Sequence, residues 1–160
     1  MDSQTRLRHF CTIGCRLVAL AVGAVLVAAG LAKFAHLDAF RAVLIEHGLL
    51  TGATVHIATI GFPTAECLVG LHLVFSGLGS ERRCAAALLL GGVLFLGTSA
   101  YAIGLSIDPP PKPVPCGCGF SIGPVNDWRP IAIRNGVFAA LLPGIGLALR
   151  KSAHSRAQGA

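Results

Sequence analysis

Charged residues are scarce in this chain of 160 residues. Asp, Glu, Lys and Arg together make up 12% of it, whereas a soluble domain usually carries about 25%. This shortage excludes an ordinary soluble domain, and 54% of the residues are hydrophobic instead. No internal repeat is present, which excludes a repeat architecture. The sequence also lacks a His, Cys and Asp cluster at ligand spacing, so we expect no metal site.

The apolar residues show no strand-like alternation, which argues against membrane strands. They gather instead into four runs, at about residues 15–32, 54–77, 84–107 and 131–149. A membrane-spanning helix needs about 20 apolar residues. The sequence therefore predicts an all-α integral membrane four-helix bundle over residues 1–151, followed by a disordered cytoplasmic tail at 152–160. A soluble helical bundle with buried helices is the alternative.

The positive charges are unevenly distributed along the chain. The net charge of +6 could suit nucleic acid, but the pattern follows the positive-inside rule, by which Lys and Arg gather on the cytoplasmic side. If the chain crosses four times, eight lie on the side of the termini: Arg6, Arg8, Arg16, Arg82, Arg83, Arg150, Lys151 and Arg156. Five lie on the other side: Lys33, Arg41, Lys112, Arg129 and Arg134. We expect both termini in the cytoplasm and no nucleic-acid partner.

The N-terminal segment allows a second interpretation. Residues 1–32 combine a basic start, an apolar middle and the small residues "AAGLA", which are also features of a signal peptide. Cleavage there would leave three helices and an outer N-terminus. We favour the uncleaved form, because the overlapping stretch "GLAKF" has another explanation below.

The first outer segment, residues 33–53, separates apolar residues by charged ones at helical spacing. These apolar residues are Phe34, Leu37, Phe40, Leu44 and Ile45. The pattern predicts an amphipathic segment that lies along the membrane interface.

Glu66 stands near the middle of the second apolar run. A carboxylate at this depth is costly, so it should face the bundle interior and find a partner or be protonated. Lys33 and Arg134, near the outer ends of their helices, are the candidate partners. Two interpretations stay open: a tie that holds helices together, and a group that handles protons or contacts a ligand.

The six cysteines divide into two kinds. Cys11, Cys15 and Cys84 are cytoplasmic in this topology, and Cys67 lies within the membrane. We expect all four to act as small apolar residues and not as redox groups. Cys116 and Cys118 belong to the outer segment "DPPPKPVPCGCGF" at residues 108–120, where five prolines fall within seven positions. Outside the cytoplasm disulfides form and persist.

The proline run favours an extended, semi-rigid conformation, which is expected to hold Cys116 and Cys118 away from the bilayer core. Glycines within and after the pair allow backbone angles that most residues cannot adopt. A disulfide between sulfurs two positions apart would close a small, strained ring, and strained, exposed disulfides tend to be oxidising and labile. The pair is therefore suited to exchange disulfides with another protein.

Five motifs occur together in this order: "GLAKF", "AF" in the first outer segment, "PTAECLVG", "CGCG" and "RPIAIRNG". On these motifs the chain resembles the MauE family of methylamine-utilisation membrane proteins, within the wider DoxX-like group, over about residues 20–150. The resemblance implies a four-helix membrane bundle in the bacterial inner membrane. It also implies a role in making or maintaining disulfides in periplasmic proteins, notably the small subunit of methylamine dehydrogenase. The matched residues are Lys33, Glu66, Cys116, Cys118, Arg134 and Asn135.

Three functional hypotheses follow. The first is a thiol–disulfide component in which Cys116 and Cys118 exchange with a periplasmic client or a thioredoxin-like protein, supported by a polar network of Lys33, Glu66, Arg134 and Asn135. No second cysteine pair lies outside to relay electrons, so a membrane quinone would have to meet the pair directly. The second is a non-enzymatic assembly factor whose disulfide only shapes its loop. A small transporter is a third option, with one carboxylate and two separated histidines as its only support.

Overall fold

The computed structural model describes residues 3–116 and 124–158. Its elements are α1 (Ser3–Ala35), α2 (Leu37–His47), α3 (Ala53–Gly77), α4 (Glu81–Ile107), β1 (Val114–Pro115), β2 (Pro124–Val125) and α5 (Arg129–Gln158). Within the described residues, four helices are long and apolar enough to cross a membrane: Thr12–Ala35, Ala53–Gly77, Glu81–Ile107 and Arg129–Lys151. The all-α prediction and its four spans are therefore confirmed.

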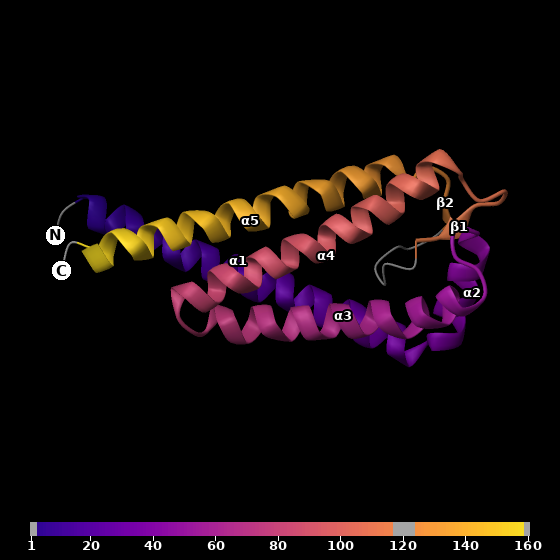
Figure 1. Ribbon diagram of the computed structural model, residues 1–160, viewed down its shortest axis with the longest axis horizontal. Coiled ribbons are helices and arrows are strands. Elements are labelled where there is room, and N and C mark those ends of the chain that lie inside the picture. Colours follow the sequence, from indigo (N-terminus) through magenta and orange to yellow (C-terminus); the bar gives the residue numbers. More distant parts are fainter. Residues whose placement is uncertain (1–2, 117–123, 159–160) are drawn as a thin grey trace.

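The four long helices form two antiparallel pairs. α1 packs mainly against α3 and α5 mainly against α4, and the two pairs meet where α3 contacts α4. Figure 1 shows the start of α1, the end of α5 and the α3–α4 turn at one end of an elongated bundle, with α2 and the two strands at the other. This arrangement is the one that four crossings require. Which end faces the cytoplasm stays a prediction.

Helix α5 extends beyond the last membrane span. It continues to Gln158, although we expected the chain to be disordered after Lys151. The sequence explains the difference, because neither proline nor glycine interrupts residues 151–158, and these are the residues that most often end a helix.

Glycine sets the distance between α1 and α3. A Cβ atom on Gly23 would lie 2.7 Å from the carbonyl oxygen of Gly70, and one on Gly30 would lie 2.8 Å from that of Pro63. Only glycine permits such close backbone approach, a device common between membrane helices. Since Gly23 and Gly30 are two helical turns apart, they fix the register in which the outer end of α1 meets α3.

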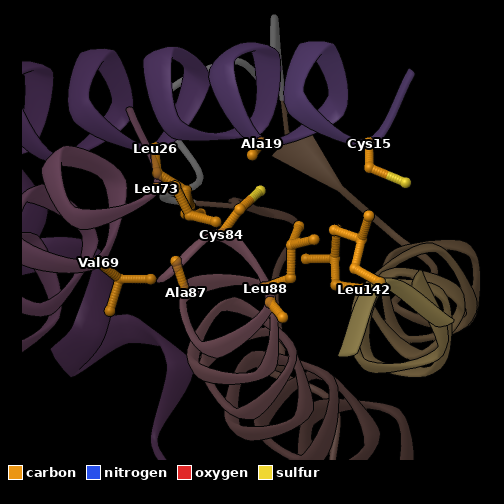
Figure 2. Packing of buried hydrophobic residues seen from close by; sticks show 11 residues of the cluster. Cys15, Ala19, Leu26, Val69, Leu73, Cys84, Ala87, Leu88 and Leu142 are labelled. Atoms are coloured by element: carbon orange, nitrogen blue, oxygen red, sulfur yellow. The ribbon is translucent and has the colours of Figure 1, made fainter. Parts of the chain in front are cut away.

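The apolar core fills the half of the bundle near the termini. It joins side chains from the four long helices, among them Cys15, Leu73, Cys84, Leu88 and Leu142, and Figure 2 shows how these side chains meet between the helices. Cys15, Cys67 and Cys84 belong to no disulfide. Cys15 and Cys84 thus serve as small apolar core residues, as the sequence analysis proposed.

Helix α2 closes the other end of the bundle. Its residues Phe40 and Leu44 are buried and cluster with Val55 of α3, and the helix ends at Gly48, whose φ of 75° suits glycine. We expected the apolar side of this segment to face the membrane interface. The face that carries Phe40 and Leu44 packs against α3 instead, while Ile45 stays 54% exposed.

Candidate functional site

The partner of Glu66 is Lys33. The Lys33 Nζ lies 2.8 Å from Oε1 and 2.7 Å from Oε2 of Glu66. Both side chains are largely buried, at 6% and 13% exposure, and the Lys33 Nζ lies 5.7 Å from the centre of the Phe40 ring. A charge at membrane depth is stabilised only by such a partner. The ion pair depends on the glycine contacts, because Gly30 precedes Lys33 by one turn of α1.

Arg134, the other candidate partner of Glu66, lies elsewhere. Its Nε donates to Oδ1 of the neighbouring Asn135 at 3.3 Å. Arg134 is exposed, whereas Asn135 is buried at 6% exposure. Although they are adjacent in α5, Arg134 is at the surface of the bundle and the amide of Asn135 is inside it.

Cys116 is buried at the outer end of the bundle. It is disulfide-bonded, its exposure is 9%, and it clusters with Leu105, Val114 and Trp128. The sequence analysis placed this cysteine on an extended, exposed proline stalk, and for Cys116 the burial contradicts that exposure. Its distance from the bilayer core stays a prediction. Cys118, its expected partner, lies outside the described residues.

The strand pair explains why Cys116 folds back. β1 and β2 are antiparallel, with Val114 opposite Val125 and Pro115 opposite Pro124. This pairing turns the chain so that Val114, the first residue of β1, is buried while Pro115 after it is exposed. Burial of Val114 and Trp128 removes apolar surface from water, which favours the folded-back form over an extended stalk.

His47 is a site residue that the sequence analysis missed. Its ring is 3% exposed; Nε2 donates to the carbonyl oxygen of Pro115 at 3.2 Å, and Nδ1 lies 2.9 Å from the Tyr101 hydroxyl. The ring also meets that of Trp128 edge-on at 4.9 Å. His47 thus holds the peptide that precedes Cys116. Its position one turn after Leu44 on the buried face of α2 was the available signal.

The hydrogen bonds of His47 define its neutral form. A carbonyl only accepts, so Nε2 carries the proton and Nδ1 is left to accept from the Tyr101 hydroxyl. Burial lowers the pKa of His47 below its ordinary value of 6.5, against smaller opposing effects of the Pro115 carbonyl and Glu46. The ring is therefore neutral at physiological pH, and a proton taken up on Nδ1 would reverse the hydrogen bond with Tyr101, whose hydroxyl oxygen would then accept.

One small cavity connects these groups. It measures about 60 Å³ and is lined by Lys33, Phe40, Leu44, His47, Phe62, Glu66, Thr98, Tyr101, Ala102, Cys116, Trp128, Ile131 and Asn135. Its surface is mainly apolar with several polar groups among the lining residues, and a space of this size has room for a few water molecules at those groups. Four residues expected from the sequence, Lys33, Glu66, Cys116 and Asn135, thus surround one space, and Arg134 lines an adjoining groove. The arrangement can hold protons next to a cysteine sulfur.

Comparison with known protein families shows to which family the chain belongs. The family described as methylamine utilisation protein MauE matches residues 11–150. The chain belongs to the MauE family.

The MauE match covers most of the chain, including all four spans and both halves of the site, and it confirms the resemblance seen in the sequence motifs. No curated protein and no solved structure matches this MauE chain. Membership and the four spans together make it a multi-pass membrane protein involved in methylamine utilisation. The wider DoxX-like relationship stays a prediction.

Proposed function

We propose that this MauE protein exchanges disulfides with periplasmic proteins from the bacterial inner membrane, with Cys116 and Cys118 as the reacting pair. The observation that carries the proposal is the placement of Cys116. A disulfide-bonded cysteine lies beside a buried ion pair, a neutral histidine and a space for water. A disulfide with a merely structural role needs none of these polar neighbours.

The exchange proceeds in two steps. A thiolate of the client attacks one sulfur of the Cys116–Cys118 disulfide, forming a mixed disulfide and releasing the other cysteine as a thiolate. A second client thiolate then attacks the mixed disulfide, which leaves an oxidised client and two reduced cysteines. The client loses two electrons and two protons to the pair. The methylamine dehydrogenase small subunit or a thioredoxin-like protein is the expected client.

Burial of Cys116 assigns the two sulfurs different tasks. At 9% exposure and beneath Trp128, Cys116 is hard for a folded client to reach. We therefore expect the client to attack Cys118, and Cys116 to leave as a thiolate into the cavity beside His47 and the ion pair.

Trapping of the mixed disulfide tests this function from the reverse direction of the exchange. In a Cys116→Ser strain the remaining Cys118 thiolate can attack the disulfide of an oxidised client, and Cys116 is no longer there to resolve the mixed disulfide that forms. We therefore expect a client adduct on non-reducing gels that disappears with reductant. Cys118→Ser should give less adduct, because Cys116 is buried. The double variant should give none, and Cys67→Ser, which removes a free thiol of α3, should behave like the wild type.

The rival function is a non-enzymatic assembly factor. It is favoured by the apolar surroundings of Cys116, since Leu105, Val114 and Trp128 form a small core that a disulfide could simply stabilise. This rival predicts no adduct in either single variant. Normal disulfides in the periplasmic proteins of both single-variant strains would then overturn the exchange function.

A further inference from the structure

A groove of about 580 Å³ runs between α1 and the α4–α5 pair. It exists because α1 packs mainly against α3 and α5 mainly against α4. Figure 1 shows α1 and α5 close at the end of the termini and apart toward the end that carries α2. On its walls Val25 is 52% exposed. In a four-helix membrane protein, a gap between two helix pairs opens sideways toward lipid.

The groove changes character along its length. Toward the termini its walls are apolar, with Val18 and Val25 from α1 and Phe138 from α5. Its outer end is formed by Glu66, Thr98, Cys116, Arg134 and Asn135. The polar groups thus gather at the end where the disulfide-bonded cysteine lies.

We infer that this groove binds a membrane-soluble quinone, with its ring beside Cys116 and its isoprenoid tail along α1. A quinone has an uncharged polar ring and a long apolar tail, in the same order as the groove. The ring carbonyls accept hydrogen bonds, and the amide of Asn135 and the guanidinium of Arg134 are donors at that end. The volume falls within the range of about 300–1,000 Å³ for small-molecule sites.

Other occupants fit these groups less well. The acyl chain of a phospholipid would fill the apolar walls, but its headgroup stays at the membrane surface and brings no acceptor to the amide nitrogen of Asn135. A helix from a second copy would cover the groove and bring no group that accepts electrons from Cys116.

The inference rests on the proposed exchange function and completes its electron balance. After exchange with a client, Cys116 and Cys118 are two thiols. When the pair re-forms its disulfide it gives up two electrons and two protons, which convert one quinone to one quinol. The cavity that joins Glu66 and His47 to Cys116 lies where these protons are released.

Trp128 can report binding at this site because it clusters with Cys116, which lines the groove. It is the single tryptophan of the chain, and quinones quench indole fluorescence at short range. Full-length protein in phosphatidylcholine nanodiscs is titrated with decylubiquinone. We expect saturable quenching in the wild type and in the Cys116→Ser/Cys118→Ser double variant, which binds without exchanging.

Two substitutions and a matched control locate the ligand. Val25→Phe narrows the groove, and Asn135→Leu removes the amide at its polar end; each should raise the Kd for decylubiquinone by at least about tenfold. Leu31→Phe enlarges another exposed apolar residue of α1, one outside the groove, and should leave the Kd unchanged. Reduced wild-type protein should convert decylubiquinone to its quinol in equal amount, and the double variant should not.

The outcomes separate this inference from the proposed function. Client adducts without saturable quenching would overturn the quinone site and leave the exchange function standing. Saturable quenching that Val25→Phe weakens, without client adducts, would support the site and overturn the exchange function. If a doxyl-labelled phospholipid quenches Trp128 and decylubiquinone does not compete with it, the groove holds lipid and the inference is wrong.

Discussion

At the scale of single residues, the Lys33–Glu66 ion pair determines how much stability a substitution of Glu66 costs. Glu66→Gln keeps an oxygen that can accept from Lys33, whereas Glu66→Leu leaves a buried ammonium unpaired. Breaking a buried pair by removing one partner costs about 3–5 kcal/mol. We expect Glu66→Leu to lose close to this amount of unfolding free energy and Glu66→Gln clearly less, measured by denaturant unfolding in detergent.

The Lys33→Met/Glu66→Leu double variant is the matching control, since it replaces both charges by apolar groups and should recover much of the loss. If Glu66→Gln abolishes client oxidation while the protein stays folded and abundant, the carboxylate has a chemical role beyond the tie between helices.

His47 gives the site a dependence on pH with a defined sign. Burial lowers its pKa from 6.5, so the unfolded chain takes up the proton at a higher pH than the folded protein. The folded state keeps its full stability above about pH 6.5 and loses stability as the pH falls from there toward the lowered pKa. Thermal unfolding of the wild type between about pH 7.5 and about pH 5 should show this loss below about pH 6.5.

His47→Gln keeps a donor for the Pro115 carbonyl but cannot titrate, so its unfolding temperature should lack this component. The same slope in the variant and the wild type would assign the pH dependence to other groups.

The residue scale also shows what sequence could and could not predict. Glu66 was found because a carboxylate at membrane depth is unusual in itself, and Lys33 was found as its candidate partner. Cys116 was found because it belongs to an outer, proline-rich segment, and Asn135 only through the resemblance to the MauE family. His47 was missed because a histidine beside a glycine at a helix end is common in sequence. Its role comes from contacts with Tyr101 and Pro115, which are 54 and 68 positions away.

At the scale of elements, the approach of α1 to α3 positions the ion pair. Gly23→Ala and Gly30→Ala each place a Cβ atom under 3 Å from a backbone oxygen of α3, so the helices must separate. We expect each to lower the unfolding free energy by about 1–3 kcal/mol, the usual cost of overpacking. Gly61→Ala is the control, because nothing lies within 4 Å of its added Cβ atom.

The measurement is again denaturant unfolding in detergent, combined with client oxidation. An unchanged stability in Gly30→Ala would show that the close approach does not hold α1 in register, and the account of how Lys33 reaches Glu66 would be wrong.

The elements differ in how far sequence determines them. The four spans follow from apolar length alone, and their ends lie within a few residues of the expected ones for α3 and α4. The orientation of α2 and the short β1–β2 pair could not be predicted, because both depend on burial against residues far along the chain. Val114 pairs with Val125 across the intervening loop, and only this pairing shows that Cys116 turns inward.

At the scale of the whole molecule, the eight-to-five charge distribution predicts that the α3–α4 turn is cytoplasmic and the β1–β2 end is outside. Two exposed positions suit a test in a cysteine-free background: Ser80, in the turn, and Lys112, in the proline run. An impermeant maleimide on intact cells should label Lys112→Cys at once and Ser80→Cys only after permeabilisation. The reverse pattern would contradict the topology and the periplasmic client with it.

The central claim is that Cys116 and Cys118 cycle between disulfide and dithiol. The direct measurement is the redox state of the pair in membranes, after acid quenching and tagging of free thiols with a large maleimide. We predict that the pair is oxidised at rest and gains two tags when reduced client is supplied. Once the client is removed, the pair should pass its two electrons to the membrane quinone and return to the oxidised state. A pair that stays oxidised whatever client thiols are present would contradict the account and leave the disulfide with a structural role.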